Sequence, residues 1–446
     1  MPRKDHWGCE HSTDNAASVA AYETAVRQFN RYRGDPVATI DAALADDPDF
    51  AGGHILRAEI HMSMWEASVL PELDVSLERL SALGNRLNPR EQRHAALIRR
   101  WADGAWDAAR ADFDRLLMDD PRDMLALQIG HLCDFYHGDR DNLRGRVLRA
   151  QAHWTPDLPG YGFVLGMRAF GQEECGAYAE AEESGRHAIA LEAEDCWAQH
   201  AIAHVMEMQG RQAEGIAWME GRRDHWAQSD NAFAFHNWWH TALYHLDQGR
   251  PERALEMYDT LIRPGDSQLQ LELVDATAML WRLHLNGIDA GARWDRLATA
   301  YLEAGDFGFY VFNDMHAMFV FAATGREADA ESVLAGATLA AEGSGTNALM
   351  TREVGLPILH AIRAFGRQDY AKAVEWLMPV RYRAHAFGGS HAQRDILHRT
   401  AIEAALRGNM RALADGLTAE RVALKPHCPF SWRQRQRALT PPQPGS

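Results

Sequence analysis

The sequence has little of what defines several classes of protein. Only five of its 446 residues are cysteine, and no two of these form a Cys-x-x-Cys pair, so we expect neither a disulfide framework nor a thiolate zinc site. No stretch approaches eighteen uncharged apolar residues, and residues 1–18 contain no apolar core of seven residues. We therefore expect no membrane-spanning helix, no secretory signal and a reduced, cytoplasmic setting.

Basic residues are also fewer than acidic ones. The chain has 46 Lys and Arg residues against 62 Asp and Glu residues, a formal net charge of −16, which argues against a nucleic-acid partner. Nothing in the sequence indicates a membrane partner. With 46% hydrophobic and 24% charged residues, the chain can bury an ordinary core, as a monomer or a homodimer.

Internal repetition is the strongest signal that the sequence does contain. Ten glycines each follow a helical run and precede an alanine-rich run, and from Gly104 onward they recur every 34 to 42 residues. That spacing fits two helices of about four turns and two short turns. A glycine ends the first helix in the left-handed region without a Cβ penalty. The ten are Gly34, Gly104, Gly138, Gly176, Gly210, Gly249, Gly287, Gly325, Gly366 and Gly408.

Small and large residues recur at fixed places after these glycines. Gly104 is followed by Ala109 and Phe113, and the same order follows Gly249. A small residue lets two helices approach closely, and the aromatic residue fills the groove beside it. The pattern predicts an all-α fold, a tetratricopeptide-repeat-like α-solenoid of about ten helix-turn-helix pairs, with an irregular helical bundle as the alternative.

The predicted solenoid has four parts along the chain. Residues 1–18 are expected to form a flexible N-terminus, and residues 19–150 to form helical repeats that cap and brace the array. Residues 151–440 are expected to form repeats around a polar lumen, followed by a flexible tail over residues 441–446.

Seven segments resemble the tetratricopeptide repeat protein 38 family. They are Arg90-Glu-Gln-Arg-His94, Asp123-Met-Leu-Ala-Leu127, Trp154-Thr-Pro-Asp-Leu-Pro159, His236-Asn-Trp-Trp-His240, Phe312-Asn-Asp-Met-His316, Val354-Gly-Leu-Pro357 and Gly388-Gly-Ser-His-Ala-Gln-Arg-Asp395. Together they run over nearly the whole chain. The resemblance implies a long helical-repeat protein and carries no reaction with it. The family's histidine pattern is matched at His200, His204, His236, His240 and His316.

Polar residues align when each repeat is counted back from its glycine. Twelve or thirteen residues before the glycine stand His236, Asp275, Asn313, Glu353 and Asp395. Nine or ten residues before it stand His200, His240 and His316. Because the same helical phase returns in consecutive repeats, these side chains are expected to form two adjacent rows on the concave side of the first helices.

One interpretation of these rows is a metal site. His200, His204 and Glu207 are spaced i, i+4 and i+7, on one stripe of a helix, and we predict them as ligands of a divalent zinc, iron or manganese ion. His200 is not followed by the glutamate that a zinc protease requires, so a protease is not expected.

A second interpretation is metal-free acid-base chemistry on a small polar molecule. The predicted catalytic residues are His236, His240, Asp275, His316 and Glu353. The predicted ligand-binding residues are Asn313, Asp314, Arg394, Asp395 and Trp239, with Arg394 clamping an anionic group.

The remaining interpretations are noncatalytic. A single buried histidine is usually structural, so the rows are also compatible with histidines that merely join adjacent helices. The groove of an adaptor would instead bind a protein or peptide segment. We expect a lumen that binds a small polar molecule and processes it by hydrolysis or another acid-base step, with or without a metal, and the adaptor is the alternative.

Overall fold

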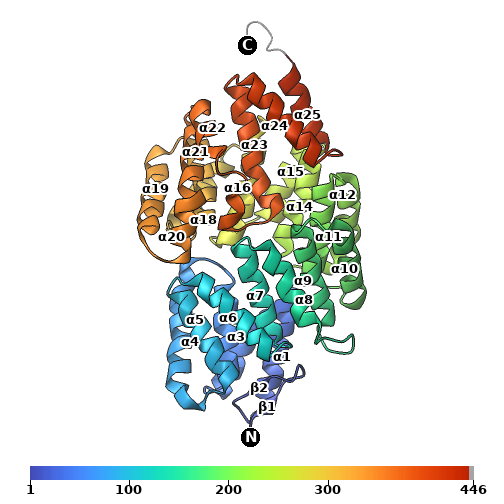
Figure 1. Ribbon diagram of the computed structural model, residues 1–446, viewed down its shortest axis with the longest axis vertical. Coiled ribbons are helices and arrows are strands. Elements are labelled where there is room, and N and C mark those ends of the chain that lie inside the picture. Colours follow the sequence, from blue (N-terminus) through green and yellow to red (C-terminus); the bar gives the residue numbers. More distant parts are fainter. Residues whose placement is uncertain (441–446) are drawn as a thin grey trace. The chain divides into compact units, whose positions relative to one another are not determined.

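A computed structural model describes residues 1–440, which form helices joined by short turns (Figure 1). The predicted tail, 441–446, lies outside the described residues. The chain divides into two units, one of residues 1–202 with 223–234 and the other of residues 203–222 with the chain from Phe235 onward. The division falls within a single helix, α11 (Cys196–Gln209).

The first unit contains a short strand pair and the helices up to α11. Its elements are β1 (Arg3–Lys4), β2 (Glu10–His11), α1 (Ala16–Arg31), α2 (Pro36–Asp46), α3 (Ala51–Met62), α4 (Leu70–Leu83), α5 (Pro89–Ala102), α6 (Trp106–Asp119), α7 (Met124–Tyr136), α8 (Arg140–Gln151), α9 (Tyr161–Glu174), α10 (Tyr178–Leu191) and α13 (Arg223–Trp226), with 3-10 turns at Ala67–Val69 and Gly84–Arg86.

The second unit contains the remaining helices. They are α12 (Gln212–Gly221), α14 (Ala234–Asp247), α15 (Pro251–Met257), α16 (Gln270–Leu285), α17 (Arg293–Ala304), α18 (Val311–Thr324), α19 (Glu327–Glu342), α20 (Thr346–Met350), α21 (Leu356–Gly366), α22 (Tyr370–Leu377), α23 (His391–Arg407), α24 (Arg411–Leu424) and α25 (Pro429–Leu439). Two π-helical turns, Tyr258–Ile262 and Thr351–Gly355, and one 3-10 turn, Ala384–Phe387, lie between them.

The repeat glycines end helices largely as expected. Eight of the ten have a positive φ, and the exceptions are Gly366 and Gly408, where Gln368 and Asn409 take the left-handed position instead. A Cβ atom on Gly366 would lie 2.7 Å from the backbone oxygen of Ala322. Helix packing, and not backbone conformation, therefore requires glycine at position 366.

Consecutive helices pack as antiparallel pairs, which confirms the all-α, tetratricopeptide-repeat-like fold. The first helices of successive pairs also contact one another within each unit, as α16 does with α18 and α18 with α21. This contact between equivalent helices is what brings side chains of the same helical phase close together.

The second unit departs from an open array, in which each repeat touches only its neighbours. Helix α23 returns to pack against α16. There Trp281 Nε1 donates to Thr400 Oγ1 at 2.9 Å, and Arg282 donates to the backbone oxygen of Ala392 at 2.7 Å. The C-terminal helices thus close onto α16, more than a hundred residues earlier in the chain.

Buried ion pairs hold this closure. Arg399 on α23 donates to both carboxylate oxygens of Asp247 on α14, each at 2.8 Å, and also to Asp395. Arg421 on α24 pairs with Asp395 at 2.7 Å. Lys425 pairs with Glu207 at 3.0 Å. Burial raises the pKa of Asp247, but the facing Arg399 outweighs it, so the net pKa is lowered and the aspartate is ionised.

The N-terminal segment differs from the flexible one that we expected. Arg3 pairs with His11 in an antiparallel bridge. Trp7, Cys9 and His11 are buried, and the indole N–H of Trp7 donates to the backbone oxygen of Pro159 at 2.9 Å. The apolar side chains between the two strands give this segment enough buried area to be ordered.

A second buried polar cluster lies under this segment. The two ring nitrogens of His94 on α5 contact Glu59 at 2.5 Å and Asp123 at 2.9 Å. Arg90 donates to Asp123 at 2.6 Å. Burial alone would lower the pKa of His94, but Glu59 and Asp123 outweigh it and raise the pKa to about 9. His94 is therefore a buried cation between two carboxylates.

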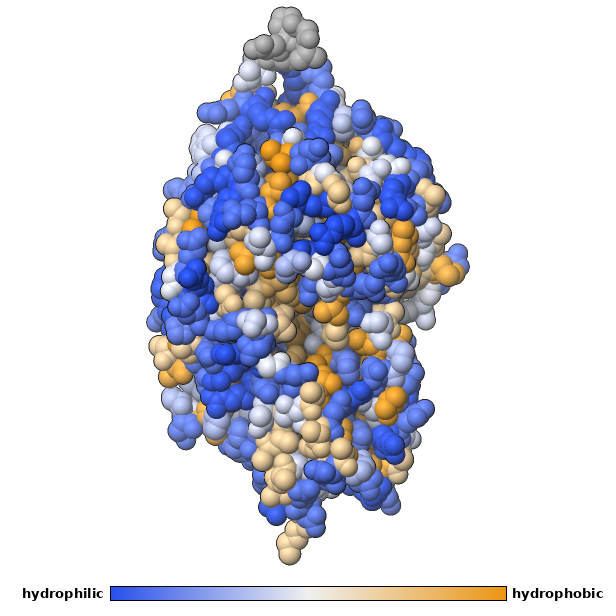
Figure 2. All heavy atoms as spheres, turned by 180° about the vertical axis from the view of Figure 1, so that it is seen from behind, coloured by the Kyte–Doolittle hydropathy of each residue, from blue (hydrophilic) through white to orange (hydrophobic). Residues whose placement is uncertain are grey.

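On the face in Figure 2, hydrophilic residues predominate and hydrophobic ones are interspersed among them. Within residues 1–440, every helix is too short or too polar to cross a bilayer. All five cysteines are free thiols.

Removing one partner of the α14–α23 ion pair should be costly. We expect Asp247→Ala to lower the free energy of unfolding by about 3–5 kcal/mol, because it leaves the buried guanidinium of Arg399 with Asp395 as its one remaining carboxylate partner. Asp259→Ala, which removes a part-exposed pair with Arg293, should cost less than about 1 kcal/mol. Urea unfolding measures both, and equal small losses would contradict the role of the buried pair.

The His94 cluster should make stability depend on pH. A folded pKa of about 9 lies above the ordinary 6.5, so the stabilisation is complete below pH 6.5 and is lost as pH rises through 9. We expect a loss of up to about 3 kcal/mol over this range. The difference in unfolding free energy between the wild type and His94→Gln should shrink accordingly, and a difference that is constant with pH would count against a charged His94.

Candidate metal centre

Two helices, α11 and α14, together carry four histidines of the candidate site. His200 and His204 lie one turn apart on α11, and His236 and His240 lie one turn apart on α14. The carboxylate of Asp195 accepts from the N–H of Ala198 at 2.9 Å, which fixes the start of α11. Residues one helical turn apart share a face, so each helix presents a pair of imidazoles.

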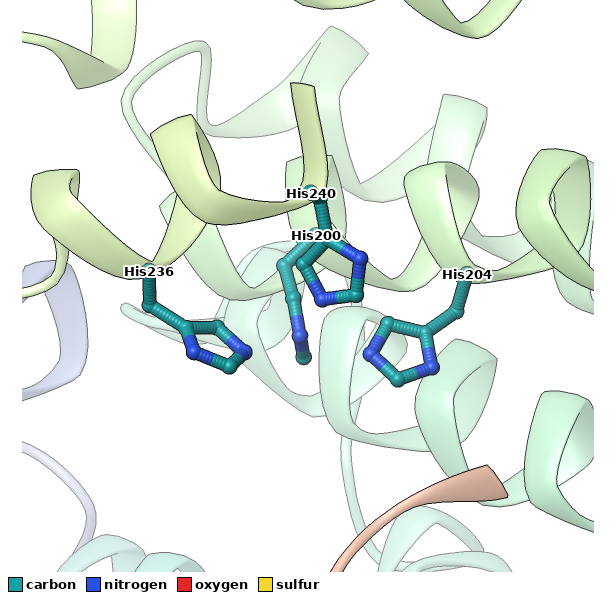
Figure 3. Close-up of side chains that lie close together, drawn as sticks. All are labelled: His200, His204, His236 and His240. Atoms are coloured by element: carbon teal, nitrogen blue, oxygen red, sulfur yellow. The ribbon is translucent and has the colours of Figure 1, made fainter. Parts of the chain in front are cut away.

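The four imidazoles converge (Figure 3). Each offers a ring nitrogen, and these four nitrogens all lie within 4.8 Å of one another. The ring centroids of His204 and His240 are 4.4 Å apart, and those of His236 and His240 are 5.0 Å apart. The four residues are at most 4% exposed. A buried four-histidine group of this kind could hold a metal ion.

His236 is oriented by a carboxylate from the next repeat. Its Nδ1 lies 2.6 Å from Oδ2 of Asp275 on α16, and Asp275 is completely buried. With Nδ1 donating to the carboxylate, Nε2 keeps its lone pair for a ligand. A carboxylate behind a metal-binding histidine is a common arrangement in metalloproteins.

His240 lies in a positive environment. Burial lowers its pKa well below the usual value, and His204, His236, Arg282 and Lys425 add to the effect. The ring is therefore neutral at physiological pH, so one of its nitrogens has a lone pair for a ligand and the other carries the proton.

Trp239 and Arg282 cover one side of the group. The indole of Trp239 stacks on His236 with the ring planes 17° apart. The Arg282 guanidinium lies 5.2 Å from the indole centroid. Arg282 was not predicted from the sequence. Its spacing was a usable signal, because it lies seven residues after Asp275 and therefore on the same stripe of α16.

His316 and its neighbours on α18 form a separate group of buried polar residues. Burial lowers the pKa of His316 to about 3, and its Nδ1 lies 2.8 Å from the backbone oxygen of Phe312. Burial raises the pKa of Asp314 to about 8, and one oxygen accepts from the N–H of Gly308 at 3.0 Å. Asn313 is also buried. His316 does not belong to the four-histidine group.

Several predicted site residues face other partners. Glu207 pairs with Lys425, and Asp395 pairs with Arg399 and Arg421. Arg394 donates to the backbone oxygens of Gly388 and Gly389. Because these groups already have protein partners, their predicted roles as metal ligand and substrate clamps are not supported by their contacts.

Glu353 is the clearest departure from the predicted row. It is exposed and pairs with Arg383 on the surface. It lies within the π-helical turn Thr351–Gly355, which inserts an extra residue into the helix. The insertion changes the helical phase, so counting back from Gly366 places Glu353 on the wrong face.

The comparisons with known proteins concern the fold. No family model matches the chain. Solved structures with a similar fold include a Rap protein complexed with competence and sporulation factor (13% identity, TM-score 0.45, covering 78% of this chain and all of that chain). Others are yeast Tom70 (12%, 0.37, 95% and 86%) and a human IFIT1 dimer with PPP-AAAA (11%, 0.37, 84% and 94%). At these scores, they support no argument about the site.

Asp275 should tune metal affinity through His236. We expect Asp275→Ala to weaken the binding of zinc by about 10- to 100-fold, because His236 loses the acceptor that fixes its tautomer and ring orientation. Asp275→Asn keeps an acceptor oxygen and should lose less. Competition with a chromophoric chelator measures the affinities, and three equal values would contradict this role.

Proposed function

We propose that this protein is a metal-dependent helical-repeat protein in which three histidines of the second unit bind a divalent ion. The three are His204, His236 and His240. The observation that carries the proposal is the convergence of the four buried histidines, one of them held by Asp275. His200, on the same continuous helix as His204, is the fourth member of the group.

The identity of the ion follows from the donor set. Imidazole nitrogens suit zinc and iron, whereas manganese prefers oxygen ligands, so zinc or iron fits better than manganese. Ligands of tetrahedral zinc are about 3.4 Å apart, given Zn–N bonds of about 2.1 Å. The four nitrogens lie within 4.8 Å of one another, so small rotations of the side chains bring three of them to that spacing.

His200 decides whether the site is catalytic or structural. Zinc with four protein ligands is closed, whereas catalytic zinc has three protein ligands and an open position. The ring of His200 contacts Phe170 and Trp197, with centroids 5.3 Å and 5.1 Å away. These aromatic contacts support a conformation in which the ring of His200 stays against its own helix. In that conformation His200 borders the open coordination position of the ion.

The proposed reaction is hydrolysis, or a related acid-base step, on a small polar molecule. A bound divalent ion supplies a Lewis acid at this position. The chain's own contribution is to exclude water by burial, to fix His236 through Asp275 and to offer His200 as a hydrogen-bonding group or base. The tetratricopeptide repeat protein 38 family is the proposed family, on the motifs given above.

The competing proposal is an adaptor without catalysis that binds a protein or peptide segment. It requires no metal, and the four histidines would then only join α11 to α14. The similar Rap structure is a complex with competence and sporulation factor, and that ligand is a property of the Rap protein alone. The two proposals differ in metal content, which a single measurement decides.

Elemental analysis of protein purified without chelators tests the metal. We expect close to one equivalent of zinc or iron in the wild type and less than about a tenth of an equivalent in His240→Ala. His245→Ala is the matched control, because His245 is buried on the same helix α14 but lies outside the group. It should retain the metal, and a wild type without metal would contradict the proposal.

His200→Ala then separates catalysis from structure. If His200 borders the open position, the variant keeps its metal and loses hydrolysis of a chromogenic test substrate such as 4-nitrophenyl acetate. If His200→Ala loses the metal as completely as His240→Ala does, the site is a closed structural one, and the enzymatic part of the proposal fails.

A further inference from the structure

A π-helical turn in the second unit ends at a buried arginine. The turn spans Tyr258–Ile262, directly after α15, and the backbone N–H of Arg263 donates to the oxygen of Tyr258 at 2.8 Å, which closes the turn. Arg263 is only 3% exposed. Single π-helical turns recur at functional sites, because the extra residue changes the direction of the side chains that follow.

The guanidinium of Arg263 has no counterpart within residues 1–440. Its Nε, Nη1 and Nη2 are all buried without a hydrogen-bond partner. The nearby carboxylates are used elsewhere, since Asp266 pairs with Arg296 at 2.7 Å and Glu272 accepts from Ser267. Glu272 and Asp266 act on Arg263 only electrostatically. A buried guanidinium without hydrogen bonds is expensive, and a bound ion is one explanation of such an unsatisfied group in a folded protein.

Two buried tyrosines lie within electrostatic reach of this guanidinium. Arg263 acts electrostatically on Tyr258 and on Tyr301. The hydroxyl of Tyr301 on α17 lies 3.2 Å from that of Thr277 on α16. Burial raises the pKa of both tyrosines, so their hydroxyls stay protonated and can donate. Arg263 and these hydroxyls together supply a charge and directed donors.

We propose that Arg263, Tyr258 and Tyr301 form a binding site for the oxyanion of a small molecule, a carboxylate or a phosphate. A guanidinium matches the two oxygens of either group in a bidentate geometry, and the phenolic hydroxyls donate to the remaining lone pairs. The site is built by the π-helical turn after α15 and by α17 and does not rest on the metal centre, so the failure of one proposal leaves the other standing.

Thermal unfolding of the full-length protein tests the site with two probes, inorganic phosphate and acetate, at constant ionic strength set by chloride. Binding to the folded state raises Tm in a saturable way, by about 2 °C or more at saturation. Because phosphate also stabilises folded proteins generally, the readout is the difference between the wild type and Arg263→Met. Arg296→Met is the control, since it removes a solvent-exposed arginine from the same region.

A saturable shift in the wild type and in Arg296→Met that is absent in Arg263→Met supports the site, and the probe that produces it distinguishes phosphate from carboxylate. No shift with either probe, or the same shift in all three proteins, overturns it. If Arg263→Met fails to fold by circular dichroism, Tyr301→Phe replaces it. That variant should bind the effective probe roughly tenfold more weakly, since it loses one hydrogen bond to a charged group, and unchanged affinity would overturn the proposal.

Discussion

The hydrogen bond between His236 and Asp275 is the contact on which the proposed site depends. It joins α14 to α16, the first helices of two successive repeats, at a heavy-atom distance of 2.6 Å in a fully buried position. The carboxylate selects the tautomer of His236 and aims its Nε2 away from α16. His240, one turn further along α14, is then turned toward His204 on α11, so one contact between repeats sets the direction of the whole group.

The closure of the second unit provides the setting for that contact. Helix α23 returns to α14 through the buried pair of Arg399 with Asp247, and Arg421 ties α24 to α23 through Asp395. Replacing such pairs with apolar residues is often neutral for stability, so their value here lies in fixing one arrangement of helices. Arg282, which donates to α23 while covering Trp239, connects this closure to the histidines, and its charge keeps their surroundings positive.

The sequence was sufficient for the architecture and for part of the site. Glycine spacing predicts the helix pairs, and equal helical phase predicts that His236 and Asp275 lie close together, because both follow from local geometry. Glu353 was misplaced because a π-helical turn leaves no composition signal. The partner of Glu207 was missed because Lys425 is 218 residues away in sequence, a separation that no local pattern encodes. The partner of Asp395 was missed because Arg421 lies on the next helix, α24, outside the rows that were aligned on the first helices.

X-ray absorption spectroscopy at the metal edge is the decisive experiment for the histidine site, because it reports the ligands of the ion itself. We expect a first shell dominated by nitrogen at about 2.0–2.1 Å for zinc, with the multiple scattering of imidazole rings, and its disappearance in a His204→Ala, His240→Ala double variant. A shell dominated by sulfur or carboxylate oxygen, or a spectrum that the double variant leaves unchanged, would contradict it.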